Sequence, residues 1–136
     1  MGMNIKLPAD INNLGKFLSA FRDFAKQHGF PRDKAQEVEI ALEEILVNII
    51  NHAYPEGSGD LELDCEHGLV DNALRLEVSD AGIYFDVLGQ PDPNVQASAE
   101  DRPVGGLGIY LVKKMMDQVS HERRGGKNIL RLVKHA

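Results

Sequence analysis

The amino-acid sequence predicts an α+β fold: a two-layer α/β sandwich with helices packed on one face of a mostly antiparallel, mixed sheet. Residues 11–28 and 32–53 carry apolar side chains at helical spacing. Residues 60–67 and 73–80 alternate apolar and polar side chains, and a further helix and strand follow them. Alternation gives a strand one buried face and one wet face, so helices are needed on only one side of the sheet.

Length, composition and charge limit the class of protein. A chain of 136 residues fits one domain, 1–136, and 43% hydrophobic with 26% charged residues is ordinary for a globular protein. The net charge of −6 argues against a surface for nucleic acid or anionic lipid. No apolar run approaches the roughly 20 residues that span a bilayer, and the first ten residues lack a signal-peptide apolar region. We expect a cytoplasmic protein that binds neither nucleic acid nor membrane.

Few residues suit a transition-metal site. Cys65 is the only cysteine and lies in a predicted strand, which favours a structural thiol. The histidines show no spacing of the zinc-helix type. A bound metal is therefore expected to be of the oxygen-liganded kind that suits magnesium.

The first 31 residues read as a strand followed by a helix. Residues 3–8 alternate and end at a proline, and Asp10 is placed to cap a helix over 11–28 with a Phe/Leu core stripe. Gly29 follows where a left-handed residue is wanted, and Pro31 stops and restarts the helical pattern.

The helix over 32–53 is the element around which the rest is organised. One side gathers seven apolar residues: Ala35, Val38, Leu42, Ile45, Leu46, Ile49 and Ala53. The opposite side gathers Glu37, Glu44, Asn48 and Asn51. Glu44 and Asn48 are four residues apart, so they share a face. On its own such a face is also what a solvated helix surface looks like.

The second half of the chain begins with a hairpin, 60–67 and 73–80, around the sequence GLVDN. Residues 83–105 contain three prolines and little periodicity, which predicts a functional lid, over about 88–104, or a disordered segment. A second amphipathic helix is predicted over 108–119, and a final strand over 128–133.

Two glycine-containing stretches suggest a ligand site. In SDAG, Asp80 ends a strand and Gly82 turns the chain, which leaves a carboxylate at the sheet edge; an ordinary turn has the same pattern. In GGLG, residues 105–108, three glycines precede a helix, and free N–H groups with the helix dipole favour phosphate. The alternative for this stretch is a hinge. It matches neither a Walker loop nor a dinucleotide fingerprint.

Together and in this order, EEILVNIINHAY (43–54), SDAG, GGLG and the closing RGGKNILRL resemble the GHKL (Bergerat) ATPases. Among these, the chain is most similar to the stand-alone anti-sigma factor serine/threonine kinases. The resemblance covers nearly the whole chain, and it implies the Bergerat, or histidine-kinase-like ATPase, fold with ATP or ADP and Mg²⁺ as cofactors.

The resemblance also implies roles for single residues. Asn48 matches the asparagine that helps to hold magnesium, and Glu44 matches a general base for an attacking hydroxyl. Asp80 matches the acceptor for the adenine amino group, and Gly82 the residue that lets the backbone approach the base. The nucleotide phosphates would be cradled by the glycine stretch Gly105, Gly106, Leu107 and Gly108. Such chemistry needs an acceptor, donors, a cation and accurate positioning.

The sequence departs from the family pattern at two places. Tyr84 and Val87 stand where the kinases have turn-forming residues. Val104 stands where some members have an arginine before the glycine pair, with Arg102 two residues earlier. These departures bear on kinase activity more than on nucleotide binding.

The function implied by the resemblance is partner switching. The protein would hold a sigma factor and phosphorylate a Ser or Thr of a small, STAS-like antagonist protein, and it would form a homodimer. Two alternatives stay open: a nucleotide-binding regulatory module without kinase activity, and a detached histidine-kinase-like ATPase domain. The last is disfavoured because no helix carries a phospho-accepting histidine with a dimerisation seam.

Overall fold

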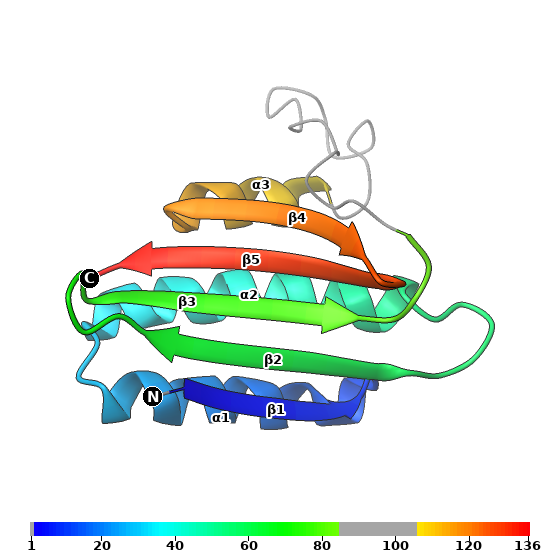
Figure 1. Ribbon diagram of the computed structural model, residues 1–136, viewed down its shortest axis with the longest axis horizontal. Helices are drawn as coiled ribbons and strands as arrows, with labels where there is room; N and C mark the ends of the chain where they lie inside the picture. Colours follow the sequence, from blue (N-terminus) through cyan, green and yellow to red (C-terminus); the bar gives the residue numbers. More distant parts are fainter. Residues whose placement is uncertain (1, 85–105) are drawn as a thin grey trace.

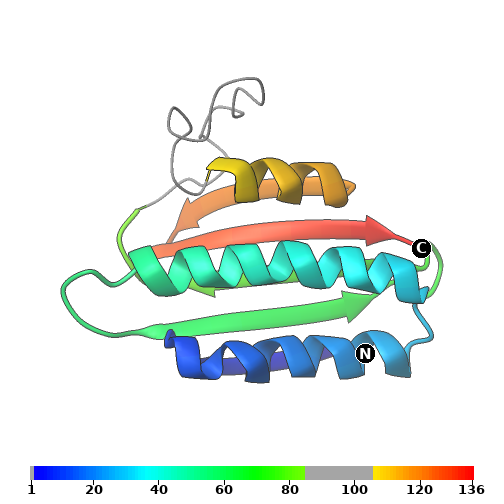
Figure 2. The ribbon, with the colours of Figure 1, turned by 180° about the vertical axis from the view of Figure 1, so that it is seen from behind.

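The computed structural model describes residues 2–84 and 106–136. In this part of the chain one five-stranded sheet is covered by helices on a single face (Figures 1 and 2). The elements, in chain order, are β1 (Gly2–Pro8), a 3-10 turn η1 (Ile11–Asn13), α1 (Leu14–Gln27), α2 (Arg32–His52), β2 (Asp60–His67), β3 (Ala73–Asp80), α3 (Gly106–Met115), β4 (Gln118–Arg124) and β5 (Lys127–His135). The predicted α+β sandwich is confirmed.

The sheet has the strand order β1-β2-β3-β5-β4, and every neighbouring pair in the described chain is antiparallel. Strand register aligns the apolar residues of one face. Leu63 of β2 pairs with Val78 of β3, which pairs with Leu130 of β5. All three are buried under the helices and form part of the core. The alternation read from the hairpin therefore places the helix layer on this face.

The N-terminal helix begins as the sequence indicates. Asp10 Oδ1 accepts a hydrogen bond of 2.8 Å from the backbone N–H of Asn12, and the chain passes through η1 before α1 starts. Gly29 follows α1 with a φ of +64°, a left-handed conformation that glycine adopts at no steric cost.

The central helix α2 lies across the sheet and buries the predicted side. Val38, Leu42, Ile45 and Leu46 are all but inaccessible to solvent. Its polar side is only partly solvated, because Glu37 accepts a hydrogen bond of 2.9 Å from the buried Nζ of Lys134.

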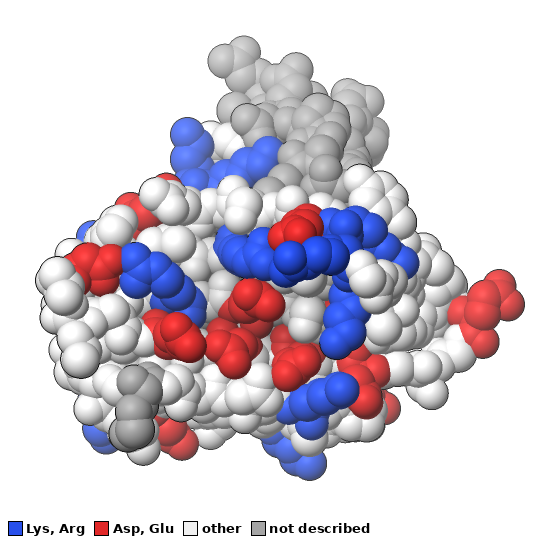
Figure 3. Space-filling view, in the orientation of Figure 1, with Lys and Arg blue, Asp and Glu red and all other residues white. Residues whose placement is uncertain are grey.

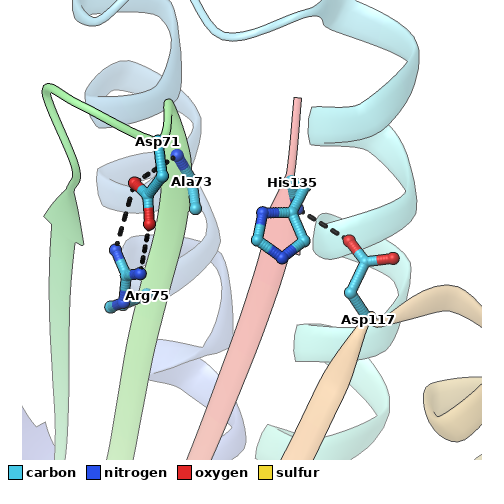
Figure 4. A network of polar contacts seen from close by, with 5 residues as sticks. All are labelled: Asp71, Ala73, Arg75, Asp117 and His135. Carbon is cyan, nitrogen blue, oxygen red and sulfur yellow. Dashed lines mark hydrogen bonds and ion pairs between the residues drawn. The ribbon is translucent and has the colours of Figure 1, made fainter.

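The predicted helix over 108–119 is wrong at both ends. The helix α3 ends at Met115, and β4, which the sequence analysis missed, starts at Gln118. The N–H of Asp117 donates to the carbonyl of Val133, and Asp117 Oδ2 accepts from the N–H of His135 at 2.7 Å (Figure 4). These bonds fasten the chain to β5 and turn it into an edge strand. The apolar residue Val119 fits a helical pattern and an alternating one equally well, so periodicity could not separate the two.

The last strand is longer than predicted. It runs from Lys127 to His135, whereas the sequence indicated 128–133. The predicted lid over about 88–104 lies outside the described residues. Within the residues that the structure describes, no helix combines the length and the apolar character needed to cross a membrane.

The face of the sheet away from the helices is charged. Figure 3 shows acidic and basic side chains side by side over the strands. Arg131 of β5 bonds Glu77 of β3 at 3.3 Å and Glu122 of β4 at 2.8 Å. Charges that neutralise one another across strands are what a solvated sheet face needs.

Candidate functional site

A pocket, called here the Asp80 pocket, lies between the C-terminal half of α2 and the ends of β3, β4 and β5. Its lining is largely apolar with a few polar groups, the usual composition of a small-molecule site. The lining residues are Ile45, Asn48, Ile49, His52, Ala53, Val78, Asp80, Ile83, His121, Asn128 and Leu130. Its volume is about 30 Å³. A cavity of this size can hold an ordered water molecule.

Asp80 is a buried carboxylate in this pocket that is held in a fixed orientation. It follows Leu76 and Val78 on the helix-covered side of β3 and is 6% exposed. Its Oδ1 accepts a hydrogen bond of 2.9 Å from the N–H of Gly82 and one of 3.0 Å from Asn128 Nδ2. No residue in the described ranges donates to Oδ2. One carboxylate oxygen thus fixes the orientation of the group, and the other remains an acceptor for a ligand.

Asn128 is the partner that sequence reasoning missed. It stands directly opposite Asp80 in the register of β3 and β5, and it is 7% exposed. Its Nδ2 also donates to the carbonyl of Ile83 at 2.7 Å, which holds the chain that leaves β3. The only signal in the sequence was a polar residue at the start of a strand rich in apolar residues.

Gly82 is required by close packing. A Cβ atom at this position would lie 2.1 Å from the carbonyl oxygen of Ala53, at the end of α2. The N–H of Ile83 donates to that same carbonyl at 2.9 Å. On the other side, Arg123 Nη1 donates to the carbonyl of Gly82 at 2.9 Å. The turn after Asp80 is therefore pressed between the end of α2 and β4.

Tyr54 also holds the turn after Asp80. Its hydroxyl donates to the carbonyl of Asp60 at 2.6 Å and accepts from the N–H of Ala81 at 2.9 Å. Burial raises the pKa of the Tyr54 hydroxyl, which stays a neutral donor over the whole physiological range. Tyr54, the last residue of the 43–54 stretch, thus joins the start of β2 to the turn after β3.

The two polar residues of α2 are placed differently. Asn48 lines the Asp80 pocket, whereas Glu44, one turn earlier on the same helix face, is not among the lining residues. Both are partly buried. The structure thus brings Asn48 and Asp80 together at one pocket, with Gly82 beside them, and sets Glu44 outside its wall.

The rim of the Asp80 pocket includes a residue of β4, the strand that the sequence analysis did not predict. His121 of β4 lines the pocket, and the ring of Tyr84 packs edge-on against it with 6.0 Å between centroids. Tyr84 itself is 62% exposed. The residue that departs from the family pattern is therefore an exposed ring resting on the pocket rim.

The glycine stretch meets α3. Gly105 lies outside the described residues, and Gly106, Leu107 and Gly108 form the first turn of α3. Figures 1 and 2 place this end of α3 at the same end of the molecule as the C-terminal end of β3. The first N–H groups of a helix lack partners within the helix and can receive an anion.

No group of three or more His, Cys, Asp or Glu side chains suited to a metal ion occurs in the described residues. Magnesium usually takes only one or two protein ligands and completes its shell with phosphates and water, so a single ligand such as Asn48 fits it. Cys65 is buried in β2, and burial raises the pKa of its thiol to about 12. The thiol is therefore structural.

Comparison with curated proteins finds serine-protein kinases. The proteins named Serine-protein kinase RsbW from Bacillus cereus (strain AH820) and from Bacillus anthracis are 29% identical over 132 residues. The match covers 94% of this chain and 81% of each of those proteins.

Solved structures share the fold. The RsbU and RsbW domains of Rv1364c from Mycobacterium tuberculosis align with a TM-score of 0.71 at 15% identity, over 99% of this chain and 32% of that chain. The SiaB–SiaC complex from Pseudomonas aeruginosa gives a TM-score of 0.62 at 14% identity, over 98% and 89%. The blue-light-activated histidine kinase domain from Erythrobacter litoralis EL346 gives 0.60 at 18%, over 90% and 60%.

The family model described as the histidine kinase-like ATPase domain matches residues 7–134, from the end of β1 to the last strand. This span includes α2, the Asp80 turn and the start of α3. The chain belongs to the histidine kinase-like ATPase domain family.

Proposed function

We propose that this chain is an ATP-dependent serine/threonine protein kinase of the anti-sigma factor type, which acts in the cytoplasm by partner switching. The observation that carries the proposal is the Asp80 carboxylate, held by Gly82 and Asn128 through one oxygen in a largely apolar pocket. An oriented acceptor between apolar walls is suited to the amino edge of a purine. The name of the serine-protein kinases that it resembles supports the activity.

Residues 1–136 would form one nucleotide-binding domain. Asp80 would accept a hydrogen bond from the adenine amino group. Asn48 would supply a magnesium ligand, and the first turn of α3, from Gly106, would receive the phosphates. Magnesium would neutralise phosphate charge, and the chain would contribute orientation and exclusion of water.

Glu44 would serve as the general base for the substrate hydroxyl. It lies one helix turn from Asn48, on the same face of α2, so its carboxylate and a magnesium-bound phosphate group would be neighbours. The substrate would be a serine or threonine of a small STAS-like antagonist. A sigma factor would be the second partner, and the family resemblance implies a homodimer.

The direct test is phosphotransfer from γ-labelled ATP to candidate STAS-like antagonist proteins, run beside calorimetric titration with ATP and ADP, with and without magnesium. We expect magnesium-dependent binding and a labelled serine or threonine. Asp80→Asn should weaken nucleotide binding by about 1–3 kcal/mol, the usual loss for an unmatched buried partner. Unchanged affinity in this variant contradicts the assigned pocket.

A second function is a regulatory module that binds nucleotide and a partner without transferring phosphate. It is favoured by the position of Glu44 outside the pocket lining and by Tyr84 on the pocket rim. If the chain binds ATP tightly but phosphorylates none of the antagonists, the regulatory module is the correct function and the kinase is not.

A further inference from the structure

A second cavity, the α1–α2 groove, lies on the outer surface of the helix layer. It is formed by the C-terminal half of α1, the turn after it and the first part of α2. Figure 2 shows these two helices side by side on the face away from the strands. The groove has a volume of about 450 Å³, compared with about 30 Å³ for the Asp80 pocket. It can therefore receive side chains of another molecule without rearrangement.

The inner wall of the groove is apolar. Phe21 and Ala25 of α1 and Phe30 of the connecting turn form its base and are at most 6% exposed. Ala35 of α2 adds a small side chain to the opposite wall. An apolar side chain inserted here would lose its water against a rigid surface, which is a favourable change.

The rim of the groove carries an unequal set of charges. Arg22 of α1 reaches across to Glu39 of α2, with 2.7 Å between Nε and Oε1. Lys26, one turn after Arg22, and Arg32, two turns before Glu39, line the same groove. Neither Lys26 nor Arg32 has an ion-pair partner among the residues that the structure describes. At one end of the groove, the carboxylate of Glu39 thus pairs with Arg22. At the other end, Lys26 and Arg32 have no such carboxylate among the described residues.

This rim contrasts with the rest of the protein. The chain has a net charge of −6, whereas the groove is lined by three basic residues and one acidic residue. An extended anion such as nucleic acid or a lipid surface would be repelled by most of the molecule. A short acidic segment meets attraction at the groove.

We propose that the α1–α2 groove docks an acidic segment of a partner protein. A carboxylate of that segment lies between Lys26 and Arg32, as Glu39 lies beside Arg22, and a neighbouring apolar side chain packs against Ala35 in the groove. Charge-assisted hydrogen bonds give the contact its specificity, and burial of the apolar side chain adds affinity.

The groove is remote from the Asp80 pocket. Arg32 and Asn48 are sixteen residues apart on one helix, a rise of about 24 Å. A segment held in the groove therefore leaves the pocket open. The inference does not depend on kinase activity, since it rests on the helix layer alone.

The test uses a fluorescein-labelled synthetic peptide with glutamates on both sides of a Leu-Phe pair, and a matched peptide with glutamine in place of each glutamate. We expect the acidic peptide to raise fluorescence anisotropy on addition of the full chain and to shift amide resonances within residues 21–39. Lys26→Glu combined with Arg32→Glu should weaken binding by about tenfold or more, and added salt should weaken binding to the wild-type chain.

The control variant is Lys16→Glu combined with Lys34→Glu, which changes the same charge on the same helices outside the groove. It should bind the acidic peptide as the wild type does. Circular dichroism and ATP titration of both variants establish that fold and nucleotide site are intact, so a failure here is separate from a failure of the proposed function.

Four results overturn the inference, three of them with the peptide. The acidic peptide fails to bind, or binds no better than its glutamine counterpart, or binds the Lys26→Glu and Arg32→Glu variant with wild-type affinity. If the chain instead sediments with phosphatidylserine vesicles and loses this through the same two substitutions, the groove recognises lipid and the protein-docking inference is wrong.

Discussion

Asn128 and Asp80 stand opposite each other in β5 and β3 and are joined by a buried hydrogen bond of 3.0 Å. The residues are 48 positions apart in the chain, and the bond is formed only because the two strands are adjacent. It leaves the carboxylate held at one oxygen before any ligand arrives. An acceptor oriented in advance saves the entropy of ordering it on binding.

Asn128→Leu, similar in size but without the amide donor, should weaken ATP binding by about 1–3 kcal/mol, because Asp80 and the carbonyl of Ile83 each lose a buried donor. Calorimetric titration measures this. Asn51→Leu, an exposed position on α2, is the control and should leave affinity unchanged. Equal affinities of the wild type and Asn128→Leu would contradict the role of the pair.

Gly82→Ala should destabilise the turn after β3. The new Cβ would collide with the backbone of Ala53, so the turn must move from the end of α2. We expect a loss of about 1–3 kcal/mol in the free energy of unfolding, the usual cost of overpacking, and weaker ATP binding. Gly57→Ala, where a Cβ meets nothing within 4 Å, is the control for urea denaturation of both variants.

The ion pair of Lys134 and Glu37 predicts an asymmetry between two substitutions. Lys134 is 5% exposed, and its Nζ donates to Glu37 and to the carbonyl of Met115 at the end of α3. Glu37→Gln leaves a buried ammonium without a counter-ion and should cost about 3 kcal/mol. Lys134→Met removes the buried charge and should cost about 1 kcal/mol.

Urea denaturation of the single variants and of the double variant measures this asymmetry. The double variant should be more stable than Glu37→Gln alone, because the buried charge is gone. A larger loss for Lys134→Met than for Glu37→Gln would show that the contact with Met115, and not the ion pair, dominates.

Glu44→Gln keeps the shape of the side chain and removes the base. If the chain is a kinase, phosphorylation of the antagonist should fall by about 10²–10⁴-fold while ATP affinity stays nearly unchanged. Glu43→Gln is the matched control, since Glu43 lies about 100° away around the helix. Transfer at the wild-type rate by Glu44→Gln would rule out the assigned role.

The turn between β2 and β3 should make a contribution to the free energy of unfolding that depends on pH. Asp71 accepts hydrogen bonds from the Arg75 guanidinium and the N–H of Ala73, which together lower the pKa of its carboxyl from 3.8 to about 2 (Figure 4). A lowered folded-state pKa contributes stability above the unfolded value that is lost as pH falls.

Asp71→Asn should therefore be less stable than the wild type above pH 4, and the difference should vanish as pH falls toward 2. Urea denaturation over this range checks it. Because the pair is exposed, high salt should reduce the difference. A difference that grows on acidification would contradict the assignment.

Local pattern was enough for most of the secondary structure. The alternation in 60–67 and 73–80 predicts a hairpin whose strands the structure reproduces residue for residue. The apolar side of α2 is buried as its spacing indicates. In both cases the spacing of the apolar residues matches the repeat of the strand or helix, so the apolar side chains gather on one face. That face must be covered.

The ends of α3 and β5 could not be predicted from the periodicity of the sequence. The turn at Asp117 is held by Val133 and His135, and no periodicity in the intervening residues encodes those bonds. For the same reason the sequence analysis predicted neither the edge strand β4 nor the position of His121 at the pocket rim. A strand is defined by its partner, and the partner lies outside any local window.

By itself, the sequence determined the two-layer fold, because helical spacing and strand alternation are local properties, and its resemblance to the GHKL ATPases nominated Glu44, Asn48 and Asp80. Only the tertiary structure decided that Asn128 holds Asp80, that Gly82 is needed for contact with Ala53, and that Lys26 and Arg32 share one groove. These relations depend on strand register and helix packing, which join residues far apart in the chain and leave no periodic trace in it.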